Sequence, residues 1–160
     1  MAASFSAVRQ PGIGPAGKST VPRLLAISVP LNFAWEMLQM PAFAGLPESW
    51  LAASAVCALA AIGDAVIVVA IYACAAYFFR DPRWFVPLSA RRYAVIVTTG
   101  LLLHLLIEWV AVHRLARWSY RDVHPIVPGL DVGVLPILQP TILLPLTFWF
   151  LGKAMYRWGS

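Results

Sequence analysis

Long apolar runs alternate with short polar segments along the chain, and this pattern predicts four membrane-spanning helices. A spanning helix needs about 20 predominantly apolar residues. The stretches that meet this length are residues 24–43, 50–79, 93–113 and 132–151. The second is long enough to tilt or to project beyond a bilayer. Pro136, Pro140 and Pro145 lie in the fourth, where they predict kinks or a broken start.

Segments rich in Gly, Pro and charged residues separate these apolar runs. The expected connections are a tight turn over residues 44–49, a basic loop over 80–92 and a longer loop over 114–131. The expected organisation is a mobile tail over 1–22, a single four-span transmembrane domain over 23–153 and a short tail over 154–160.

The composition agrees with a membrane protein. Hydrophobic residues make up 61% of the 160 residues and charged residues 12%, whereas soluble domains average about 45–50% and about 25%. These values exclude an ordinary soluble globule and a disordered chain. We therefore expect an all-α, polytopic membrane protein built as a four-helix transmembrane bundle.

The net charge of +5 is best explained by orientation in a membrane, so we expect no nucleic-acid partner. If the N-terminus is cytoplasmic, the basic residues on that side are Arg9, Lys18, Arg23, Arg80, Arg83, Arg91, Arg92, Lys153 and Arg157. The opposite side holds only Arg114, Arg117 and Arg121. This bias predicts that both termini are cytoplasmic, in the inner membrane of a bacterium.

Residues 12–19 match the phosphate-loop pattern G-x-x-x-x-G-K-[ST]. That loop functions between a strand and a helix, where its backbone amides surround phosphates. No apolar strand precedes it here, and Pro15 removes an amide from the loop. We therefore expect no nucleotide partner.

The first predicted span contains an acidic residue, Glu36. Asn32, Glu36 and Gln39 are spaced i, i+4 and i+7, which places them on one helix face, and Trp35 lies beside them. A hydrogen-bonded seam between helices would explain the two amides. A carboxyl group within a bilayer is expensive and usually functional, so Glu36 is a candidate catalytic residue.

Two other spans carry the remaining candidate catalytic residues, Asp64, His104 and Glu108. His104 and Glu108 are four residues apart on one helix face, where a carboxylate can orient an imidazole. Asp64 follows Gly63 near the middle of the second span. These groups either form a reactive site or only stabilise the bundle. With three histidines in the chain, we expect no metal site.

The candidate substrate-binding residues lie at similar depth or in the loop above. Within the spans they are Asn32, Trp35, Gln39, Trp109 and Gln139. In the loop they are Arg114, Arg117, Tyr120 and Arg121. The arginines are suited to an anionic head group, or to contact with anionic lipids. Trp118 and Tyr120 are also typical interfacial anchors. Trp35 and Trp109 would stabilise a carbocation if they faced the site.

The segment Asn32-Phe-Ala-Trp35-Glu36 resembles the N-x-x-W-E segment of the fungal integral-membrane terpene cyclases that make meroterpenoids and indole diterpenes. The resemblance covers about ten residues, and those cyclases have more spans. It implies that Glu36 is the acid that initiates cyclisation, with Asp64 or Glu108 as the second acidic residue.

We therefore expect a small membrane enzyme that acts on a lipid or isoprenoid by buried acid/base chemistry, as a cyclase or isomerase does. No cofactor is expected. The alternatives are a proton-coupled small-molecule transporter and a non-catalytic membrane subunit. The chain is also compatible with a homo-oligomer.

Overall fold

The computed structural model describes residues 16–87 and 89–157, and most of them are helical. The long helices are α1 (Ala16–Gln39), α2 (Trp50–Phe79), α3 (Ala90–His113) and α4 (Val134–Arg157). Three stretches are long and apolar enough to cross a membrane: Trp50–Phe79, Ala90–His113 and Val134–Met155. The expected all-α class is confirmed in this part of the chain, and the three apolar helices are compatible with an integral membrane protein.

Most helix boundaries agree with the apolar pattern, and the differences have local causes. α2 has the predicted bounds. α1 begins at Ala16, within the segment expected to be a tail, and includes Pro22 and Pro30; residues 1–15 of that tail lie outside the described residues. α1 ends at Gln39, before residue 43, because Pro41 has no N–H to continue the helix. A short 3-10 helix, η1 (Met40–Ala42), follows.

α4 begins at Val134 and continues through Pro140 and Pro145. The structure therefore shows a continuous helix in place of the broken start expected there. Pro136 lies in the first turn, where the missing N–H would have no partner in any case.

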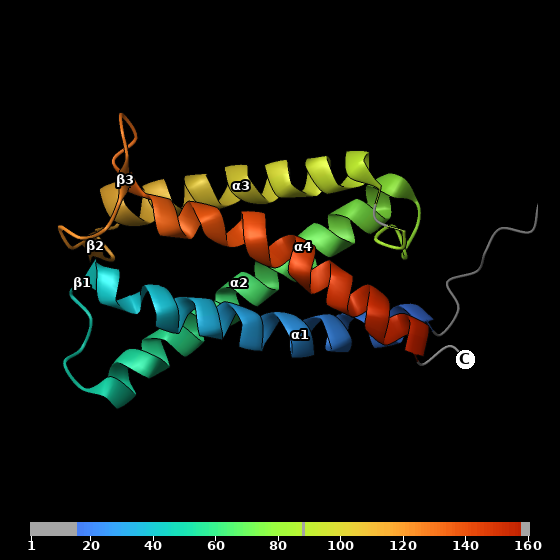
Figure 1. The fold of residues 1–160 in the computed structure, drawn as a ribbon, viewed down its shortest axis with the longest axis horizontal. Helices are drawn as coiled ribbons and strands as arrows, with labels where there is room; N and C mark the ends of the chain where they lie inside the picture. The colour runs from blue at the N-terminus through green and yellow to red at the C-terminus, as the bar shows by residue number, and fades with distance from the viewer. Residues whose placement is uncertain (1–15, 88, 158–160) are drawn as a thin grey trace, which may run out of the picture.

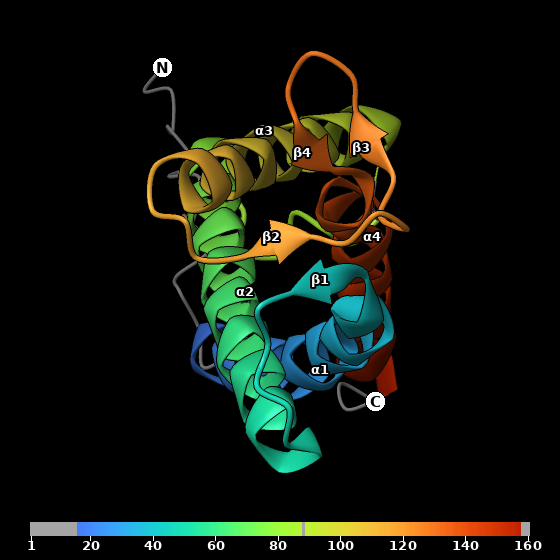
Figure 2. The same cartoon turned by 90° about the vertical axis from the view of Figure 1, so that its left-hand side faces the viewer.

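The helices form an antiparallel bundle in which α2 and α3 diverge (Figures 1 and 2). α1 packs along α2 and α4, and α3 packs along α4. α2 crosses the bundle diagonally, so its first half leads away from α3 (Figure 1). α2 and α3 consequently make few contacts although they are consecutive in sequence.

Two short strand pairs cover one end of the bundle. β1 (Phe43–Ala44) pairs antiparallel with β2 (Ser119–Tyr120), and β3 (Ile126–Val127) pairs with β4 (Val132–Gly133). Arg121 reinforces the first pair: its backbone N–H donates to Ala42 O, and its Nε donates to Phe43 O, both at 3.0 Å. We call residues 40–46 and 114–133 the cap. The segment expected to be a long loop is therefore folded against the end of α1 (Figure 2).

The opposite end of the bundle is filled by an apolar core. Its buried side chains are Leu24, Val68, Ile71, Tyr72, Trp84, Phe85, Ile96, Leu144, Phe148 and Leu151. The basic α2–α3 loop is folded into this core. Trp84 Nε1 donates to Tyr72 O at 3.3 Å, and Arg92 Nη1 donates to Trp84 O at 2.8 Å. Dense side-chain packing therefore closes the end of the bundle that lies farthest from the cap.

Two glycines allow a direct test of the α3–α4 packing. A Cβ at Gly100 would overlap Leu144 Cδ1, whereas a Cβ at Gly63 would meet nothing within 4 Å. Both Gly→Ala changes gain helix propensity, so that gain cancels in the comparison. We expect Gly100→Ala to be less stable than Gly63→Ala by about 1–3 kcal/mol. Denaturant unfolding of both variants in mild detergent measures the difference, and equal stability would contradict the close α3–α4 contact.

Candidate functional site

A cavity of about 320 Å³ lies beside the cap, between the diverging halves of α2 and α3. Its polar lining residues are Glu36, Gln39, Asp64, His104, Glu108 and Gln139. Its apolar lining residues include Met40, Phe43, Val56, Ala60, Ile67 and Ile107. All four candidate catalytic residues, which come from α1, α2 and α3, therefore surround one space.

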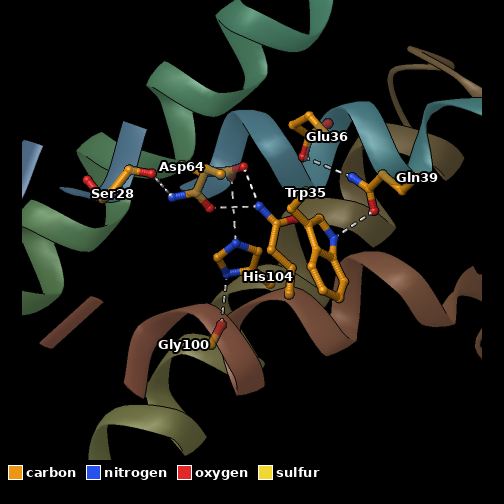
Figure 3. A network of polar contacts seen from close by, with 9 residues as sticks. Ser28, Trp35, Glu36, Gln39, Asp64, Gly100 and His104 are labelled. Carbon is orange, nitrogen blue, oxygen red and sulfur yellow. Dashed lines mark hydrogen bonds and ion pairs between the residues drawn. The ribbon is translucent and has the colours of Figure 1, made fainter. Parts of the chain in front are cut away.

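Asp64 and His104 form a pair across the cavity. His104 Nδ1 lies 3.1 Å from Gly100 O one turn earlier in α3, and His104 Nε2 lies 3.6 Å from Asp64 Oδ1 (Figure 3). A carbonyl oxygen only accepts hydrogen bonds, so Nδ1 carries a hydrogen. Nε2 then faces Asp64 either as the N–H of an imidazolium or as the acceptor of a proton held by the carboxyl. The two side chains thus lie within ion-pair distance of each other.

Gln139 of α4 holds Asp64 from the other side. Its Nε2 donates to Asp64 Oδ2 at 2.6 Å and to Asn32 Oδ1 at 2.9 Å. Asn32 Nδ2 in turn donates to Ser28 O at 2.8 Å. Asn32 and Gln139 are 2% and 3% exposed. These buried amides join α1, α2 and α4 and fix the position of the Asp64 carboxyl group. The interhelical seam expected of Asn32 and Gln39 is therefore found for Asn32, whereas the side-chain hydrogen bonds of Gln39 stay within α1.

Glu36 is oriented from within α1 and η1. Trp35 Nε1 donates to Gln39 Oε1 at 3.1 Å, and Gln39 Nε2 donates to Glu36 Oε1 at 2.8 Å (Figure 3). Trp35 is not among the residues that line the cavity. It therefore acts on Glu36 through Gln39 and does not face the space in which a carbocation would form.

Glu108 is bound by two donors from the cap. Trp118 Nε1 donates to Glu108 Oε1 at 3.1 Å, and the Tyr120 hydroxyl donates to the same oxygen. Burial raises the pKa of Tyr120 above its ordinary value, and the hydrogen bond to Glu108 raises it further. Both donors therefore fix the position of the same Glu108 oxygen at the cap end of the cavity.

Trp118 is the cavity residue that sequence reasoning assigned only to membrane anchoring. Trp118 and Tyr120 are two positions apart in an extended segment, so their side chains lie on the same side of the backbone. That spacing could have indicated that the two side chains bind the same group, which is Glu108. Cys57 and Phe43 also line the cavity, and no motif or charge pattern singles them out.

The remaining predicted binding residues lie outside the cavity lining. Trp109 contacts His113, with ring centroids 5.5 Å apart, and the Arg114 guanidinium lies 5.3 Å from the Trp109 ring centre. Arg114, Arg117 and Arg121 are exposed. The structure therefore does not bring the three arginines to the acidic residues, because the cap directs them outward or binds them to backbone carbonyls.

His124 is the buried titratable group of the cap. Its ring packs 5.0 Å from the Phe43 ring and 4.6 Å from the Tyr120 ring, and neither nitrogen makes a well-formed hydrogen bond to the described residues. Burial lowers the pKa of His124 below its ordinary value of 6.5, partly opposed by the Ala42 backbone. A proton on this ring is therefore unfavourable in the folded cap.

We expect acid to destabilise the protein through His124. Below pH 6.5 the unfolded imidazole takes up a proton that the folded His124 refuses, so stability falls as the pH falls toward the folded pKa. The loss is at most about 1.4 kcal/mol per pH unit. His124→Phe keeps a ring in the same place and should flatten this decline in stability at low pH (the acid limb) in unfolding experiments over roughly pH 5–7, the titration range of histidine.

Exposed His113 supplies the control. His113→Gln should retain the acid limb, because this change leaves the buried ring of His124 in place. An unchanged acid limb in His124→Phe would contradict the assignment.

No group of three His, Cys, Asp or Glu side chains in residues 16–87 and 89–157 is arranged to hold a metal ion. Comparisons of the chain with protein-family models, curated proteins and solved structures give no match. The function is therefore inferred from the geometry of the cavity.

Proposed function

We propose that this protein is an integral membrane enzyme that isomerises or cyclises a lipid or isoprenoid by acid/base chemistry in the cavity. The observation that supports this proposal is the convergence of Glu36, Asp64, His104 and Glu108, from three helices, on one largely apolar space. Ionisable side chains within a bilayer are expensive, and several around one cavity are typical of a site that handles protons.

In the proposed arrangement α1 is the fourth spanning helix. Its polar residues Asn32, Glu36 and Gln39 contact the interior, while Leu38 is 79% exposed and suited to lipid. The charge bias favours cytoplasmic termini, and we propose the inner membrane of a bacterium as the location. The cap then lies on the opposite side of the inner membrane.

The hydrogen-bond pattern suggests a role for each group. Glu108 accepts two hydrogen bonds from the cap, so we assign it the role of a fixed acceptor at the cavity wall. Glu36 accepts a hydrogen bond from Gln39, one donor fewer than Glu108, and we assign it the transferable proton. The base is the Asp64–His104 pair in the form whose only proton is the hydrogen on His104 Nδ1.

The reaction then balances without an added redox partner. The Glu36 carboxyl transfers its proton to an alkene carbon of the substrate, and a carbocation develops on the neighbouring carbon. Loss of a proton from a neighbouring carbon to the Asp64–His104 pair forms a new alkene. The product has the mass of the substrate, and proton transfer back to Glu36 restores the enzyme.

The cavity geometry favours this function over the transporter alternative. A transporter needs a water path to both membrane faces. Here the cap covers one end of the cavity and the apolar core fills the bundle beyond its other end. The structural-subunit alternative accounts for Asn32 and Gln139 but assigns no role to a cavity lined by three acids.

Reaction in heavy water tests the proposal. Purified protein in lipid nanodiscs is incubated in D₂O with a neutral-lipid and isoprenoid extract, and products are analysed by mass spectrometry. Protonation from solvent-exchanged Glu36 should give isomers that carry about one deuterium per turnover. A matched incubation with heat-denatured protein measures uncatalysed exchange. Absence of any deuterated isomer across the extract would contradict the enzymatic function.

A further inference from the structure

We infer that the cavity receives an uncharged apolar chain, that this chain enters sideways between α2 and α3, and that phosphate-bearing lipids are rejected. This inference depends on the proposed function for its membrane setting and deepens it by naming the substrate class. It is carried by the shape of the opening and by the charges around the cavity.

The opening lies along one face of α2. Val56, Ala60, Gly63 and Ile67 line the cavity at helical spacing, and Ile107 faces them from α3. Val56 and Ile107 are 42% and 40% exposed although they line the cavity. They therefore form an apolar rim where α2 and α3 diverge. An apolar rim admits a lipid chain directly from the hydrocarbon region, without passage through water.

The charges around the cavity disfavour an anionic head group. The described lining residues include three carboxyl groups and one imidazole, and no Lys or Arg is among them. The imidazole is already paired with Asp64 at 3.6 Å. A phosphate would be buried beside carboxyl groups with no available cation, which is strongly unfavourable.

A cationic head group is also a poor match. Gln139 binds Asp64, and two cap donors bind Glu108. Glu36 is bound by Gln39 and carries a proton in the proposed function, so it offers no free negative charge. An ammonium group would have to lose its hydration to enter a mainly apolar space. The match that remains is a neutral chain with a reactive alkene whose polar groups, such as a hydroxyl, are uncharged.

The cavity accommodates the reactive end of such a chain. Its volume of about 320 Å³ corresponds to roughly ten water molecules in the liquid, which is enough for a few isoprene units. The rest of a longer chain can extend through the opening into the bilayer.

Competition photolabelling tests the inference with one tail and three head groups. The probe is a farnesol analogue that carries a diazirine, applied to the full chain in nanodiscs. The competitors are farnesol, farnesyl diphosphate and farnesylamine. We expect labelling of the cavity residues of α2 and α3, with farnesol at least about tenfold more effective than either charged competitor.

Two phenylalanine substitutions on α2 test the route of entry. Gly63→Phe places a ring in open space at the cavity, where it should block the opening and abolish labelling. Leu59→Phe places the same ring on the lipid-facing side, where Leu59 is 71% exposed, and should leave labelling unchanged. Equal labelling of both variants would overturn sideways entry, and effective competition by the diphosphate or the amine would overturn the neutral class.

Failure of this inference is distinguishable from failure of the proposed function, because labelling requires binding without turnover. Labelling of the cavity without deuterated products would contradict the enzyme and leave the binding inference intact. Deuterated products together with effective competition by farnesyl diphosphate would support the enzymatic function and overturn the neutral substrate class.

Discussion

Glu36→Gln is expected to reduce deuterium incorporation by about 10²–10⁴-fold, the usual contribution of a positioned general acid. The variant should fold normally, because the glutamine Oε1 can still accept the hydrogen bond from Gln39 Nε2 that Glu36 Oε1 accepts at 2.8 Å. Only the transferable proton is lost. Product formation per molecule of folded protein in D₂O measures the effect.

Glu48 provides the matched control. It is exposed in the turn before α2 and does not line the cavity, so Glu48→Gln makes the same chemical change away from the site. We expect it to keep wild-type incorporation. If Glu36→Gln also retains activity within about a factor of three, Glu36 is not the acid.

Asp64→Asn is expected to lower activity by about 10²-fold or more and to leave the bundle folded. The asparagine can satisfy both neighbours: its oxygen accepts from Gln139 Nε2, and its amide donates to His104 Nε2. It cannot take up a proton from the substrate.

Gln139→Leu is the comparison variant, because it should lower the stability of the fold, which Asp64→Asn should leave intact. It leaves Asn32 and Asp64 without their shared donor, so we expect a loss of stability of about 1–2 kcal/mol. Denaturant unfolding in detergent separates the two variants. If Asp64→Asn were as unstable as Gln139→Leu and its loss of activity followed only the loss of folded protein, Asp64 would be structural.

The candidate acids could be selected from the sequence because charges within apolar runs are rare. Glu36, Asp64 and Glu108 stand out against their surroundings, and His104 follows from its i, i+4 spacing with Glu108. Their convergence could not be predicted, since it depends on how four helices cross. The bounds of α2 were predictable because no helix-breaking proline interrupts that run.

The cap could not be predicted, because its strands are two residues long and one pair joins segments far apart in the sequence. β1 meets β2, and Phe43 lies opposite Tyr120. No local pattern indicates such a contact. The arginines illustrate the same limit. Arg114 and Arg121 could be assigned to one loop from their positions in the sequence. The directions of their side chains depend on local partners, which are the Trp109 ring for Arg114 and Phe43 O for Arg121.

The order of the helices along the chain also has a consequence for biogenesis. The first two helices leave the ribosome before His104 on α3 and Gln139 on α4, which are both partners of Asp64. Until α4 is synthesised, Asp64 is in a half-built bundle without these partners. In the proposed membrane setting, the nascent protein therefore passes through a stage in which the Asp64 carboxyl group needs shelter from lipid.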